Sequence, residues 1–199
     1  MVAGGEGADT AATQCEWRHL LDASVAVRLG AYSVLSGALI AGLWKVVRRG
    51  RTPALPGLVA FEAILGLVRA NATAWLASPL GVRQVVSWRL LAGSLLLAVH
   101  GFSLLQLHGG TTGGIETTTV VVRRGACGVI RHPLYLSLTL FALGAYLTSS
   151  GMLAGGLLGV AVAGLVITSY VEEREDESRF GESYREYMRS TKRFVPFDC

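Results

Sequence analysis

Five long apolar segments dominate the sequence and restrict the folds that it can adopt. We place them at residues 25–47, 56–77, 85–107, 132–150 and 152–171. Each is close to the length of roughly 20 residues that a helix needs to cross a bilayer. In hydrocarbon every backbone polar group must be hydrogen-bonded within the chain, and these segments lack the strict alternation of a barrel strand. The sequence therefore predicts an all-α integral membrane protein with about five transmembrane helices.

The composition and the distribution of charge agree with a multi-pass membrane protein. Of the 199 residues, 51% are hydrophobic and only 16% are charged, which is unusually apolar for a soluble domain. Residues 1–24 lack a basic start followed by an apolar core, so we interpret them as a polar tail and not as a cleaved signal peptide. Residues 25–107 then hold three helices, and 108–199 hold two more and a charged C-terminal region. Basic residues follow the first segment and precede the fourth, which predicts an N-terminus outside and a C-terminus in the cytoplasm.

Several other classes of function find no support in the sequence. Cys15, Cys127 and Cys199 are widely spaced and form no CxxC pair, so we expect neither a disulfide framework nor a metal site. The redox compartment and the oligomeric state stay open. The net charge of +4 is accounted for by the cytoplasmic loops, and nothing indicates a nucleic-acid partner.

Polar and small residues interrupt the apolar segments. Glu62 and Arg69 are seven residues apart, hence on one helix face, and we expect Arg69 near the bilayer midplane with His100 on a neighbouring helix. They would form either a buried polar contact that fixes helix packing or the wall of a substrate chamber. Small residues of the last segment predict close packing against the fourth segment, in preference to a dimer interface. These residues are Gly155, Gly159 and Ala163.

The last two apolar segments are joined only by a Ser-Ser-Gly turn at residues 149–151. Two helices of about 20 residues that leave and return to the same membrane face must bring their cytoplasmic ends together. We therefore expect Arg131 and His132 to lie beside Glu172 and Glu173. A stripe along the following charged stretch predicts a cytoplasmic amphipathic helix. The stripe consists of Glu173, Glu177, Phe180, Tyr184, Tyr187 and Met188.

These pieces resemble the C-terminal signature of the integral-membrane methyltransferases, a superfamily that includes isoprenylcysteine carboxyl methyltransferases and phospholipid N-methyltransferases. The likeness is carried by "RRGACGVIRHPLYLS", then "EE", "FGESYREY" and "RFVPF", and it covers residues 119–197. It implies that 108–199 is a catalytic region with a cytoplasmic pocket for S-adenosyl-L-methionine. It also implies a lipophilic or lipid-like substrate that enters from the bilayer.

The resemblance implies roles for individual residues. Arg131 would orient an anionic substrate group, and Glu172 would position that group or accept its proton. His132 and Tyr135 would donate hydrogen bonds and stack, and Glu173 would bind the cofactor's ammonium or ribose hydroxyls. Pro133 suits the first turn of a helix. The full set expected at the cofactor is Gly125, Cys127, His132, Pro133, Tyr135, Leu136, Glu173 and Tyr184.

The expected activity is methyl transfer to an acceptor of the isoprenylcysteine carboxylate type, with phospholipid N-methylation as the alternative. An NADPH-dependent membrane reductase and a non-catalytic bundle are further alternatives, because membrane sterol reductases resemble the same signature. The chain also departs from the superfamily pattern. Thr119 and Cys127 stand where many relatives have His and Tyr, so contacts there would have to come from the main chain.

Overall fold

The computed structural model describes residues 26–27, 29–42, 44, 54–72, 74–75, 81–110 and 120–194. The chain divides into two compact units, Met1–Gly42 and Leu43–Cys199. In the first unit, an apolar helix spans Leu29–Gly42. The second unit contains every candidate site residue that the structure describes, whereas Thr119 lies outside the described residues.

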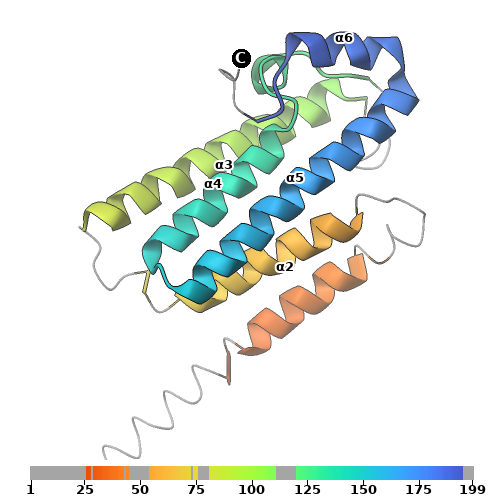
Figure 1. Ribbon diagram of the computed structural model, residues 1–199. Coiled ribbons are helices and arrows are strands. Elements are labelled where there is room, and N and C mark those ends of the chain that lie inside the picture. The colour runs from red at the N-terminus through yellow and green to blue at the C-terminus, as the bar shows by residue number, and fades with distance from the viewer. Residues whose placement is uncertain are drawn as a thin grey trace, which may run out of the picture. The chain divides into compact units, whose positions relative to one another are not determined.

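The second unit is built from helices, as the apolar segments predict. Figure 1 shows α4 between α3 and α5, with α2 beside α5 and with α6 and η2 at one end. Among the described residues the regular structure is helical, apart from one isolated parallel bridge between Ile130 and Lys192. The all-α prediction is therefore confirmed. The elements are α2 (Ala54–Asn71), α3 (Val82–His108), the 3₁₀ turn η2 (Gly125–Gly128), α4 (Pro133–Thr148), α5 (Met152–Phe180) and α6 (Glu182–Ser190).

Two of these helices, α3 and α5, are long and apolar enough to cross a membrane by length and composition. The helices Pro133–Thr148 and Leu29–Gly42 are also apolar but shorter. Helix α2 ends at Asn71 and not at residue 77. The number of membrane spans and the orientation of the chain stay predictions.

The C-terminal helices follow the expected hairpin and then depart from a single helix. Helix α4 ends at Thr148 and α5 begins at Met152, so the turn at residues 149–151 is confirmed. Helix α5 continues past the expected span to Phe180, where Gly181 adopts a φ of 59° that glycine tolerates best. The predicted stripe is therefore divided between α5 and α6.

Small residues bring helices together, but at other positions than expected. A Cβ on Gly164 would lie 2.9 Å from the Ala60 Cβ of α2, and one on Gly144 would lie 3.0 Å from Leu91 of α3. By contrast, a Cβ on Gly159 would meet nothing within 4 Å. Of the expected ridge only Gly155 faces α4, where a Cβ would lie 3.8 Å from the ring of Tyr146, whereas Gly159 and Ala163 are exposed. The closest approach of α5 is instead to α2, at Gly164.

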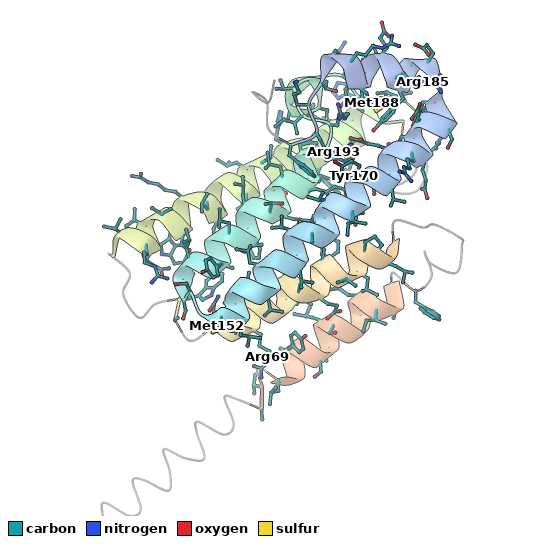
Figure 2. The ribbon with its side chains drawn as sticks, in the orientation of Figure 1. Arg69, Met152, Tyr170, Arg185, Met188 and Arg193 are labelled. Carbon is teal, nitrogen blue, oxygen red and sulfur yellow. The ribbon has the colours of Figure 1, made fainter. Side chains whose placement is uncertain are left out.

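The polar residues of the apolar segments do not gather at one level. Arg69 lies in the last turn of α2 and is exposed. Figure 2 shows it at the same end of the bundle as Met152 and far from Tyr170 and Arg193. His100 instead lies beside η2, where its Nε2 accepts a hydrogen bond from the Ala126 amide at 3.4 Å. Arg69 and His100 therefore do not meet, contrary to expectation, and the depth of Arg69 in a membrane stays a prediction.

Candidate functional site

A short main-chain pairing forms the frame of the candidate site. The segment that precedes α4 runs parallel to the segment that follows α6. The Lys192 amide donates to the Val129 carbonyl at 3.1 Å, and the Arg131 amide donates to the Lys192 carbonyl at 2.8 Å. The His132 amide donates to the Arg193 carbonyl at 3.3 Å. These bonds join segments that are about 60 positions apart in the sequence. The joined segments lie beside the part of α5 that follows its predicted membrane segment, residues 152–171.

Glu173 lies at the centre of a buried ion cluster, which we call the Glu173 cluster and define as Glu173, Arg131, His132 and Arg193. The Glu173 side chain is only 7% exposed. Its Oε1 accepts from Arg131 Nε at 2.8 Å and from Arg193 Nε at 3.1 Å, and it lies 3.2 Å from His132 Nε2. Its Oε2 accepts from Arg193 Nη2. Sequence analysis thus predicted the meeting of residues 131, 132 and 173 correctly.

The electrostatics of Glu173 follow from these partners. Burial by itself would raise the pKa of Glu173, but hydrogen bonds from His132, Arg193 and Arg131 outweigh it and hold the pKa far below its ordinary range. Glu173 is therefore ionised and fully engaged within the protein. A cofactor ammonium would have to displace one of these cations to reach it.

Arg131 is engaged as completely as Glu173. Besides the ion pair, its Nη1 donates to the Met188 carbonyl at 3.1 Å and to the Thr191 carbonyl. The side chain is 11% exposed. Planar guanidinium groups suit such divergent hydrogen bonding, which a lysine could not reproduce. The geometry therefore gives Arg131 a role in joining α6 and the C-terminal segment to α5.

Glu172 differs from Glu173 in its exposure to solvent, its partners and the direction of its pKa shift. Its side chain is 37% exposed, and among the described residues it forms no ion pair with a lysine or arginine. Its Oε1 accepts from the Tyr135 hydroxyl at 2.5 Å, and its Oε2 lies 3.9 Å from His132 Nδ1. The pKa of Glu172 is raised because its carboxyl group is removed from water. The Tyr135 hydroxyl and His132 offset only part of that rise. A carboxylate with these properties can exchange a proton or receive a cation.

Two aromatic rings border the Glu173 cluster. The rings of His132 and Tyr135 are stacked at 5.5 Å with an angle of 14° between them. The ring of Phe194 lies 6.0 Å from His132 on the C-terminal segment. Pro133 is the first residue of α4, as expected, and is buried, whereas Leu136 is half-buried one turn after His132.

The remaining predicted cofactor residues belong to the neighbouring contact between η2 and α6. Cys127 is buried, and its carbonyl accepts from the Tyr187 hydroxyl at 2.5 Å. Burial also raises the pKa of the Cys127 thiol. Tyr184 is buried beside Tyr187, with ring centroids 5.8 Å apart. Gly125 has a φ of 56°, and a Cβ there would lie 2.8 Å from His100 Nε2, so this position requires glycine.

Arg193 and Phe194 are among the residues that sequence analysis missed. Both belong to the "RFVPF" motif quoted above, but neither was assigned a role. Arg193 contacts both oxygens of Glu173 and also lies over the ring of Tyr170, 3.5 Å from its centroid. The sequence shows that Arg193 follows the predicted amphipathic helix, but it does not show that Arg193 pairs with Glu173.

Comparison with known proteins gives no independent assignment of this site. No family model, no curated protein and no solved structure matches the chain.

Proposed function

We propose that this protein is an S-adenosylmethionine-dependent membrane methyltransferase that acts on a lipophilic or lipid-like acceptor. The observation that carries the proposal is the meeting of the Arg-His-Pro segment with the Glu-Glu pair, which the resemblance to membrane methyltransferases requires. These residues are about 40 positions apart, and three pairs of their side chains lie within 4 Å, namely Arg131–Glu173, His132–Glu173 and His132–Glu172. The apolar helices α3 and α5 support a membrane location for this site.

The residues around Glu172 fit the cationic end of the cofactor. Glu172 and Asp176 are one turn apart on α5 and therefore share a face. Burial raises the pKa of both carboxyl groups, and the charge of Asp176 raises that of Glu172 further. Among the described residues neither carboxylate forms an ion pair with a lysine or arginine. An ammonium placed here would relieve their repulsion, so we assign this group to Asp176, one turn from Glu172, and not to Glu173.

Methyl transfer of this kind requires no covalent bond between the substrate and a protein side chain. When bound, S-adenosylmethionine supplies an electrophilic methyl group on a sulfonium. Methyl transfer is an in-line displacement, so catalysis depends mainly on alignment of the acceptor. For an amine acceptor, Glu172 is placed to accept the proton that methylation releases, and the Tyr135 hydroxyl fixes its Oε1. A carboxylate acceptor releases no proton and needs only to be aligned. Arg131 and Glu173 hold the surrounding segments in place.

Cofactor binding to the purified protein in detergent micelles tests the proposal. We expect saturable binding of S-adenosylhomocysteine in a calorimetric titration and none of NADPH. Asp176→Asn should weaken binding at least about tenfold, or about 1.4 kcal/mol. Glu186→Gln is the matched control, because Glu186 is an exposed carboxylate paired with Arg123 at 3.0 Å. Binding of NADPH alone, or of neither compound, would refute the assignment.

A further inference from the structure

Arg193 brings a second positive charge to a carboxylate that already has one. Arg131 alone would neutralise Glu173, so charge balance does not explain why another guanidinium reaches both of its oxygens. Figure 2 shows Arg193 beside Tyr170, on whose ring it lies. The ring fixes the guanidinium plane from one side. Arg193 therefore restricts the orientation of the carboxylate as well as its charge.

The orientation of Glu173 determines the state of the His132 ring. With both oxygens held by Arg193, Oε1 faces His132 Nε2 at 3.2 Å. An ionised carboxylate can only accept, so the nitrogen that meets it must carry the proton. In the neutral ring the other nitrogen, Nδ1, then has a lone pair, and it faces Glu172 Oε2 at 3.9 Å. His132 is thus placed between two carboxylates that have different roles.

The segment that follows α6 places both Arg193 and Phe194 beside His132 and Glu173. Its main chain pairs with residues 129–132, which places the side chain of Arg193 on Glu173 and the ring of Phe194 against His132. Tyr135 stacks on the same ring. The imidazole is 8% exposed. The ring therefore cannot rotate freely, and each ring nitrogen keeps its own carboxylate neighbour.

We propose that Arg193 is a positioning residue for methyl transfer: it holds Glu173 so that His132 is protonated on Nε2 and presents Nδ1 to Glu172. This role rests on the proposed function. Where the acceptor is an amine, the proton that it loses on methylation passes to Glu172, and the Nδ1 lone pair of His132 faces the new carboxylic acid. A carboxylate acceptor loses no proton, and His132 then only orients Glu172. Arg193 contacts neither the acceptor nor the cofactor in this scheme.

The test combines a spectroscopic measurement with kinetics. The imidazole nitrogens of the ¹⁵N-histidine-labelled protein are recorded in micelles at about pH 8.5, where imidazole side chains are ordinarily neutral. His132 is identified among the four histidines by its loss in His132→Gln. The wild-type protein should show the Nε2-protonated tautomer, and Arg193→Lys, which keeps the charge but not the two-pronged contact, should show a mixture of tautomers. Turnover should fall at least about fivefold, and affinity for S-adenosylhomocysteine should change less than about twofold.

Arg189→Lys is the matched control, because Arg189 is an exposed arginine of α6 that lies 3.5 Å from Glu182. It should leave the tautomer and the turnover unchanged. If Arg193→Lys retains the Nε2 tautomer and full turnover, the positioning role is overturned while the proposed function stands. An Nδ1-protonated or doubly protonated His132 in the wild-type protein overturns the role even if Arg193→Lys does not fold. Absence of cofactor binding by the wild-type protein overturns the proposed function instead.

Discussion

The two adjacent glutamates should respond in opposite ways to the same isosteric substitution. Glu173→Gln removes the counter-charge from two guanidinium groups whose side chains are 11% and 24% exposed. Breaking a buried ion pair by removing one partner costs about 3–5 kcal/mol. Because Arg193 retains some access to water, we expect about 3 kcal/mol. At roughly 2–4 °C per kcal/mol for a chain of this size, Tm should fall by roughly 6–12 °C.

Glu172→Gln should have little effect or raise the stability at neutral pH. The side chain is 37% exposed, and a Gln oxygen can still accept from the Tyr135 hydroxyl. Since burial disfavours the charge of Glu172, its removal relieves a penalty. We expect a change within about 0.5 kcal/mol, or a gain.

Intrinsic fluorescence of the four tryptophans during heating in detergent micelles measures both effects. Glu186→Gln serves as the surface control, because Glu186 is 68% exposed and its pair with Arg123 should contribute less than about 1 kcal/mol. Equal Tm shifts for Glu172→Gln and Glu173→Gln would refute the division of roles between the two residues. So would a Glu173→Gln variant as stable as the control.

Three further predictions concern pH, backbone conformation and topology. The folded-state pKa of Glu173 is depressed, so its contribution to stability is complete above the unfolded pKa of about 4.3 and is lost as the pH falls. The difference in Tm between the wild type and Glu173→Gln should therefore narrow in acid. A constant difference would contradict this. Gly125→Ala should cost at least about 1–3 kcal/mol because of its positive φ and the close side chains of α3, whereas Gly159→Ala, in helix and in open space, should not lower Tm. In intact cells lacking native cysteines, a membrane-impermeant thiol reagent should label Ser150→Cys and miss Arg185→Cys; the reverse pattern would invert the predicted topology.

The parts of the fold that could be predicted from sequence depend on local signals. Apolar runs and the Ser-Ser-Gly turn predicted the hairpin of α4 and α5, and hairpin geometry then predicted that Arg131 would reach the Glu-Glu pair. The end of α2 was missed because it depends on a tertiary contact. Asn71 is buried there, and its amide donates to the Ala145 carbonyl at 2.9 Å.

The division of roles within the site was also beyond the sequence. Adjacent residues on a helix differ by about 100° in direction, so Glu172 and Glu173 must face different surroundings. Which one faced the cations depended on how α5 packs against its neighbours. Arg193 was missed because the chain must first turn at Gly181 and then pair with residues 129–132. Such a return involves contacts between distant segments and leaves no periodic pattern.

The central claim is that Glu172 serves a methyl-transfer reaction inside a frame held by Glu173. It is tested most directly by incubating the purified protein with methyl-labelled S-adenosylmethionine and a panel of acceptors, namely prenylated thiols, phosphatidylethanolamine and isoprenoid acids. We predict incorporation into one class of acceptor by the wild-type protein. In Glu172→Gln, at an equal folded amount and an unchanged or higher Tm, incorporation should fall at least about tenfold, or about 1.4 kcal/mol. Equal incorporation by the two proteins, or none by the wild type with any acceptor, would contradict the claim.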